Sequence, residues 1–170
     1  MVSTNTKTPS RQTTESKATE LWVRADKEWE AGRVKSAFRL MLAAVRMGER
    51  GAQVTLGYMY DNAVGTKRNV RAALYWYKRA YRRGESCAAH NIGIVWRDAG
   101  NFRRSLYWFE RAIRMNHGDD GEAFLEIAKL YLNGNRDRRK AASFLRKVCR
   151  SKSVTQDAVE QAQLLLKREF

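Results

Sequence analysis

Apolar and small side chains recur along this chain in blocks that read as two helices joined by a turn. The fullest block covers residues 56–84, where these side chains return every three or four positions, the spacing of one face of a helix. Equivalent positions follow 32 to 36 residues later, the clearest being Leu56, Gly57 and Tyr60 with Ile92, Gly93 and Trp96, and Trp76, Tyr77 and Ala80 with Trp108, Phe109 and Ala112. Self-similarity at such a period predicts an all-α solenoid.

We expect a right-handed solenoid of four helix pairs, closed at its C-terminal end by one capping helix. Gly48 and Gly84 follow helices in the position that glycine favours, and Asp119 with Asp120 precedes one, where carboxylates cap free amides. The pairs are expected at residues 18–48, 51–84, 86–117 and 119–150, and the capping helix at residues 154–168. The two helices of each pair are called the A helix and the B helix, in chain order.

The first 17 residues are expected to form a disordered, basic tail. They are rich in Ser and Thr and have no large apolar side chain beyond Met1 and Val2, so burial cannot offset the entropy lost on ordering. No stretch resembles a secretory signal, and no apolar run approaches the ~20 residues that cross a bilayer. A cytoplasmic location is therefore expected, in which Cys87 and Cys149 stay free thiols.

Small residues stand where the A and B helices of one pair should meet. They are Ala25, Gly57, Gly93 and Ala128 on the A helices, and Ala37, Ala73, Ser105 and Ala141 on the B helices. Small side chains on both sides let helix axes approach to about 8 Å. The neighbouring aromatic residues are expected to fill the core between repeats.

The fullest block also resembles a known repeat. Its pattern is A-x3-LG-x2-Y, a loop glycine and A-x2-WY-x2-A-x3-G, carried by Ala52, Leu56, Gly57, Tyr60, Gly65, Ala73, Trp76, Tyr77, Ala80 and Gly84. This pattern is similar to the Sel1-like repeat, a branch of the tetratricopeptide repeat superfamily. The third block departs from it at Ser105, where the family has alanine, and lacks four loop residues. The resemblance covers residues 18–150 and implies a scaffold that binds proteins and has no catalytic residues.

The net charge of the chain indicates what kind of partner it attracts, whereas no sequence motif indicates catalysis. The chain has 33 Lys and Arg against 18 Asp and Glu, a net charge of +15, which attracts anionic partners of any kind. It contains no glycine loop with its lysine for phosphate, no cluster of metal ligands and no nucleophile motif. We therefore expect no enzyme activity, no cofactor and no metal.

The A helices predict a first candidate surface, because this superfamily lines its concave side with them. Aromatic, amide and charged side chains together suit an extended peptide whose backbone needs hydrogen-bond partners. The candidate peptide-binding residues are Trp22, Val54, Tyr58, Asp61, Asn62, His90, Ile94, Arg97, Asp98, Lys129 and Asn133. Tyr58 and Ile94 are equally explained as packing between repeats, and His90 as a packed or surface histidine.

The B helices predict a second candidate surface, a basic stripe. When these helices are aligned on Ala37, Ala73, Ser105 and Ala141, basic residues fall at shared positions on one helical face, with Tyr75 and Tyr107 between them. The first column is Lys35, Arg71, Arg103 and Arg139, the second is Arg46, Arg82, Arg114 and Arg150, and the third is Arg79, Arg111 and Lys147.

These surfaces favour a non-catalytic protein-interaction scaffold whose partner has acidic character. A nucleic-acid-binding module is the alternative, because arginine with interleaved tyrosine can hold phosphates and stack on bases. The same stripe would also suit an anionic membrane surface, or it would only keep the outer face solvated. The sequence leaves open which surface is used and whether the chain associates with itself.

Overall fold

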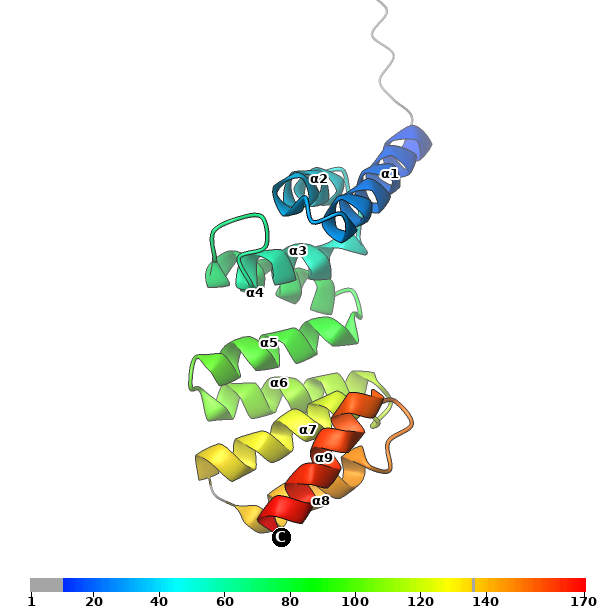
Figure 1. The fold of residues 1–170 in the computed structure, drawn as a ribbon. Coiled ribbons are helices and arrows are strands. Elements are labelled where there is room, and N and C mark those ends of the chain that lie inside the picture. Colours follow the sequence, from blue (N-terminus) through cyan, green and yellow to red (C-terminus); the bar gives the residue numbers. More distant parts are fainter. Residues whose placement is uncertain (1–10, 136) are drawn as a thin grey trace, which may run out of the picture. The chain divides into compact units, whose positions relative to one another are not determined.

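The computed structural model describes residues 11–135 and 137–170, which form helices and connecting turns with no strand among them (Figure 1). The expected all-helical fold is therefore confirmed. No helix within these ranges combines the length and the apolar character needed to cross a membrane. The chain divides into an N-terminal unit that ends at Trp76 and a C-terminal unit that begins at Tyr77.

The N-terminal unit is built from three helices and the first part of a fourth. These are α1 (Arg11–Glu30), α2 (Val34–Arg46), α3 (Ala52–Asp61) and α4 (Val70–Tyr81). α1 packs along α2, and α2 packs on α3. Their common core contains Ala25, Met41 and Met59, which are fully buried, and the partly buried Trp22 and Trp29 pack against it.

Helix α1 begins at Arg11, earlier than the start expected at residue 18. Residues 11–17 are therefore helical rather than part of a disordered tail, and residues 1–10 lie outside the described residues. From Thr14 onwards, Ala18 is the first buried residue of α1. Polar contacts also support this part of the helix: Thr19 Oγ1 donates to Glu49 Oε2 at 2.8 Å, and Ser16 Oγ donates to Glu20 Oε1 at 3.5 Å.

The loop inside the second helix pair lies against the first pair. Gly65 has a φ of +69°, and a Cβ there would lie 2.1 Å from the Val34 carbonyl oxygen, so only glycine fits. Beside it, the rings of Phe38 and Tyr60 meet edge to face with centroids 5.2 Å apart. The Asn69 amide closes the loop by donating to the Tyr60 carbonyl at 2.8 Å. The longer loop of this repeat therefore contributes to packing between two helix pairs.

The C-terminal unit contains the end of α4 and five further α-helices. These are α5 (Ser86–Asp98), α6 (Phe102–Met115), α7 (Gly121–Leu130), which runs into the π-helix η1 (Tyr131–Asn135), α8 (Arg138–Val148) and α9 (Gln156–Glu169). Each helix from α5 to α8 packs on the next, and α9 packs on both α7 and α8 (Figure 1). The helix pairs α5–α6 and α7–α8 are thus followed by a single final helix, as the sequence predicts.

Gly93 and Ser105 show how small residues bring the two helices of a pair together. A Cβ on Gly93 would lie 2.6 Å from Cε1 of Phe109, whose ring is fully buried, so α5 presents bare backbone to α6. Ser105 Oγ donates to the Gly93 carbonyl at 2.8 Å, which satisfies a buried hydroxyl. The remaining predicted small positions are also buried: Ala25, Ala37, Gly57, Ala73, Ala128 and Ala141.

The two aspartates in the turn before α7 have different hydrogen-bond partners. Asp120 caps α7, because its Oδ1 accepts a hydrogen bond from the Ala123 amide at 2.9 Å. Asp119 instead accepts from the Ser151 hydroxyl and, at 2.9 Å, from the Lys152 amide. The predicted cap is therefore confirmed for Asp120, whereas Asp119 ties the start of α7 to the turn that follows α8.

Candidate functional site

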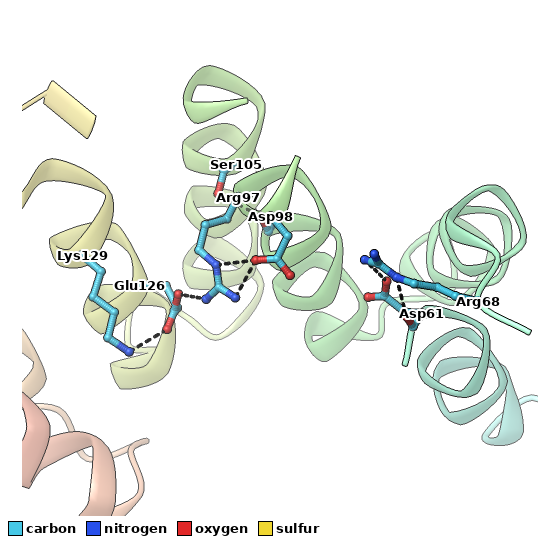
Figure 2. Close-up of polar contacts among 8 residues, drawn as sticks. Asp61, Arg68, Arg97, Asp98, Ser105, Glu126 and Lys129 are labelled. Atoms are coloured by element: carbon cyan, nitrogen blue, oxygen red, sulfur yellow. Dashed lines mark hydrogen bonds and ion pairs between the residues drawn. The ribbon is translucent and has the colours of Figure 1, made fainter. Parts of the chain in front are cut away.

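On the A-helix side of the C-terminal unit, four charged side chains form one connected network (Figure 2). Arg97 and Asp98 end α5, whereas Glu126 and Lys129 lie on α7. Glu126 accepts hydrogen bonds from the Arg97 guanidinium and, at 3.0 Å, from Lys129 Nζ. Arg97 Nε also donates to Asp98 Oδ1 at 2.9 Å. The structure thus brings three predicted residues together around a fourth that was not predicted.

Glu126 is the centre of this network, and it is only 9% exposed. Burial alone would raise the pKa of its carboxyl group, but the hydrogen bonds and charges of Lys129 and Arg97 outweigh burial and hold the pKa below its ordinary value of 4.5. Glu126 is therefore ionised at neutral pH. One sequence signal could have found it, since it is a carboxylate three positions before Lys129 in a mainly apolar helix.

Two hollows adjoin the network. One, of about 220 Å³, lies among Arg97, Phe102, Lys129 and Asn133. The other, of about 400 Å³, lies between α7 and α9, with Lys129, Asn133 and the exposed Leu164 on its border. Arg97, Lys129 and Asn133 therefore lie on one surface of this unit.

His90 and Ile94, which the sequence places on the same face, contact the core instead. The His90 ring lies edge to face against Phe109 with centroids 5.3 Å apart, and Ile94 packs against the core cluster of this unit. Burial lowers the pKa of His90, although the nearby carboxylates, Asp120 first among them, act in the opposite direction. The structure favours the interpretation of both residues as packing residues.

Acidification below pH 6.5 is expected to destabilise the C-terminal unit through His90. Its folded-state pKa lies below the ordinary 6.5, so the unfolded chain takes up the proton first. The His90 contribution to stability is therefore complete above pH 6.5 and is lost as the pH falls towards the folded-state pKa. His90→Phe should flatten this dependence in urea unfolding followed by circular dichroism between pH 7 and about pH 5.

The second histidine provides the control for this experiment. His117 is exposed and has a φ of +55°, so His117→Asn keeps a residue that accepts this conformation. It removes an imidazole elsewhere in the chain while His90 keeps its contact with Phe109. An equal slope in the wild-type chain and in His90→Phe would contradict the assignment.

In the N-terminal unit, two of the predicted A-helix residues are partly buried. Trp22 lies over the start of α3, where a Cβ on Gly51 would come within 2.7 Å of its ring. Trp22 also packs against the core cluster of this unit, and Val54 is half-buried. Only part of each side chain is therefore accessible to a ligand.

Of the other predicted A-helix residues of this unit, Tyr58 and Asn62 are exposed, whereas Asp61 is partly buried. The Tyr58 ring is exposed and lies 5.8 Å, centroid to centroid, from Trp29. Asn62 Nδ2 donates back to the Tyr58 carbonyl at 3.1 Å. Asp61 Oδ1 pairs with Arg68 Nη2 at 3.4 Å (Figure 2). Their use by a peptide stays a prediction.

Most residues of the three basic columns are exposed on the B helices. The exposed members are Lys35, Arg46, Arg71, Arg82, Arg103, Arg114, Arg139, Lys147 and Arg150. Within the part of the chain that the structure describes, none of these side chains forms an ion pair with a carboxylate. Arg79 and Arg111 are half-buried. Continuity of the columns over all four repeats stays a prediction.

Two residues of the third column lie over aromatic rings. The Arg111 guanidinium is 4.6 Å from the centroid of the Tyr107 ring and donates a hydrogen bond to the Tyr81 hydroxyl. Lys147 Nζ is 4.7 Å from the centroid of Phe144 and 5.5 Å from that of Phe124. Cation–π contacts of this kind hold the charged groups close to the protein surface.

Helix pairs that meet at small residues and recur along the chain define an α-helical repeat protein of the tetratricopeptide kind. The sequence model of the Sel1 repeat family matches residues 51–85, 89–117 and 123–153, which is more than half of the chain. The chain belongs to the Sel1 repeat family. The match covers the second, third and fourth helix pairs, whereas the first pair lies outside it. Sel1 and TPR repeat proteins generally mediate protein–protein interactions and are typically non-catalytic.

Solved structures of helical-repeat proteins share the fold at low sequence identity. A Sel1 repeat protein from Oxalobacter formigenes has a TM-score of 0.61 and 18% identity over 87% of this chain, which spans only 62% of that protein. MamA has a TM-score of 0.63 and 19% identity over 88% of this chain and 81% of its own. A thermophilic TPR protein of Thermus thermophilus has a TM-score of 0.67 and 18% identity. The match covers 88% of this chain and 81% of that protein.

These neighbours confirm the predicted solenoid class, while its handedness stays a prediction. None of the curated proteins matches the chain.

Proposed function

We propose that this chain is a non-catalytic scaffold that holds a protein partner of acidic character on its B-helix side. The observation that carries the proposal is a difference in charge pairing between the two sides of the C-terminal unit. On the A-helix side, Arg97 and Lys129 share the carboxylate of Glu126. On the B-helix side, Arg114 and Arg150 are exposed and have no carboxylate partner among the described residues.

Unpaired arginines on an outer face favour a carboxylate-bearing partner. The guanidinium group presents a planar fork of donors that matches a carboxylate in two parallel hydrogen bonds. The net charge of +15 further attracts acidic surfaces and speeds their encounter. The A-helix cations offer less, because their internal partners already neutralise part of their charge.

Capture from a native lysate at physiological salt tests this proposal. Wild-type chain should retain an acidic protein that survives nuclease treatment, and Arg82→Glu with Arg114→Glu should lose it because the reversed charges repel its carboxylates. Arg24→Glu with Lys27→Glu is the matched control, since both residues are exposed on α1, an A helix. Equal loss in both double variants would show that only net charge matters and would overturn the assignment to the B-helix side.

A second candidate, nucleic-acid binding, is favoured by one observation on α6. Tyr107 is 46% exposed, and the Arg111 guanidinium lies over its ring beside the exposed Arg103 and Arg114. Exposed aromatic rings among arginines can stack on bases and hold phosphates. In that case nuclease would remove everything captured, and binding of a single-stranded oligonucleotide would weaken steeply with salt.

A further inference from the structure

A groove of about 500 Å³ opens between the B helices α6 and α8 of the C-terminal unit. Its apolar lining consists of Ile113 from α6, Phe124 from α7 and Phe144 from α8. Phe124 is 7% exposed, and its ring centroid lies 6.1 Å from that of Phe144. The two rings therefore form a recessed floor that is continuous with the core rather than a raised platform.

Three cations border this floor. Arg114 lies near the end of α6, Lys147 lies near the end of α8, and Arg150 follows α8. None of the three pairs with a carboxylate within the described ranges 11–135 and 137–170. Lys147 Nζ reaches over both phenylalanine rings, so a group that enters the groove meets a positive charge next to an apolar surface.

The two acidic residues at the groove leave the positive charge in excess. Asp119 accepts hydrogen bonds from the Ser151 hydroxyl and the Lys152 amide, which hold its carboxylate at the turn. Glu110 is the other carboxylate at the border. Three cations therefore face one carboxylate that has no hydrogen-bond donor within the described part of the chain.

We propose that this groove binds an acidic peptide segment that carries one bulky apolar side chain between its carboxylates. The apolar side chain would fill the recess beside Ile113, Phe124 and Phe144, and the flanking carboxylates would pair with Arg114, Lys147 and Arg150. A volume of about 500 Å³ lies in the range of ligand sites and has room for one large side chain with adjoining backbone. The proposal rests on the proposed function and names the place and the chemistry of the contact.

The geometry disfavours nucleic acid as the occupant of this groove. Base stacking requires an exposed ring face, whereas Phe124 is almost fully buried and Lys147 lies over both rings. An aliphatic or aromatic side chain of a peptide needs only a recess, where it displaces water from the apolar floor. The carboxylates of the neighbouring peptide residues then pair with the cations at the border.

The test uses the full chain and a synthetic nine-residue peptide of Glu and Asp with one central Phe. Binding is followed by fluorescence anisotropy and by the isoleucine methyl signals in NMR spectra. The chain has four isoleucines, of which Ile113 lines the groove and Ile94 lies on α5, an A helix. The Ile113 methyl signal, identified with Ile113→Val, should shift on titration while that of Ile94 stays in place. The same peptide with central Ala should bind about tenfold more weakly.

Matched charge reversals then separate the groove from net charge. Lys147→Glu and Arg114→Glu should each weaken binding of the Phe peptide about tenfold, because each removes an attractive contact and adds a repulsive one. Arg146→Glu and Arg104→Glu make the same charge change at exposed positions of the same two helices that belong to no basic column and do not line the groove. They should weaken binding no more than about twofold.

Three results would overturn the inference. Equal loss in the groove variants and in their controls would mean that only the general field attracts the peptide. A shift of Ile94 without one of Ile113 would place the peptide on the A-helix side, and equal affinity of the Phe and Ala peptides would exclude an apolar anchor. In each case acidic partners still bind, so a scaffold for acidic partners would stand, although binding on the A-helix side would overturn the assignment of the partner to the B-helix side. Absence of binding by any acidic peptide or protein would contradict the proposed function as well.

Discussion

Gly93→Leu is expected to cost the C-terminal unit about 3 kcal/mol or more of its free energy of unfolding. The first side-chain atom at this position would lie 2.6 Å from Cε1 and 2.7 Å from Cδ1 of Phe109. That ring is 0% exposed and belongs to the core cluster of the unit, so it has no space into which to move. The helices α5 and α6 would have to separate, which would also break the hydrogen bond from Ser105 to the Gly93 carbonyl.

Urea unfolding followed by circular dichroism measures this effect. Ala99→Leu is a suitable control, because Ala99 is exposed at the end of the same helix and the substitution places the new side chain in water. It should change the free energy of unfolding by less than about 0.5 kcal/mol. A Gly93→Leu chain as stable as the control would show that the two helices are not in close contact at Gly93.

Glu126→Leu is expected to destabilise the C-terminal unit by about 2 kcal/mol, because it leaves two cations near the core without their shared partner. The side chain of Glu126 is 11% exposed, whereas those of Arg97 and Lys129 are 34% and 32% exposed. The cost is therefore smaller than for a fully buried pair, since water reaches both cations. Arg97→Met in the same chain should restore part of the loss, because a thioether tolerates the apolar surroundings that a lone guanidinium does not.

A double-mutant cycle in urea unfolding tests this coupling. The four chains are the wild type, Glu126→Leu, Arg97→Met and the double variant, and the coupling free energy between the two sites should exceed about 1 kcal/mol. Lys140→Met provides the control, because it breaks an exposed pair with Asp137 in the same unit and should cost less than about 0.5 kcal/mol. Additive effects of Glu126→Leu and Arg97→Met would contradict a network that stabilises the fold.

The helix pairs could be predicted from the sequence because their signal is steric and local. Gly93 and Ser105 mark the place where α5 meets α6, and both are buried at that contact. A small residue at a fixed interval identifies a helix crossing without knowledge of any neighbour, since only a small residue fits there. The same reasoning extends to Ala25 and Ala37 in the first pair, although the family match does not reach them.

The start of α1 could not be predicted because the local sequence around it is polar. Residues 11–17 contain no apolar pattern, and the contact from Thr19 to Glu49 joins two segments that are distant in sequence. Polar residues of this kind are compatible with a helix as well as with a disordered chain. Their local sequence therefore does not decide between the two states.

The candidate surfaces were only partly predictable because side-chain direction decides them. Lys147 falls in a basic column by its position, but its ammonium group lies over Phe124 and Phe144. Glu126 stands among apolar residues, and only the approach of Arg97 from another helix explains how its charge is tolerated there. Helical periodicity places a residue on a face, but the contacts that it makes come from the neighbouring helices.

The contacts of Gly65 also show where this chain cannot be divided without loss of packing. The recognisable repeats begin at residue 51, between α2 and α3. A fragment that starts there keeps Leu56 and Met59 but loses Met41, which belongs to the same buried cluster. Its loop glycine would then face water in place of the Val34 backbone. The boundary of sequence similarity at residue 51 thus cuts through this buried cluster, and the unmatched first pair covers apolar surface of the second pair that such a fragment would expose.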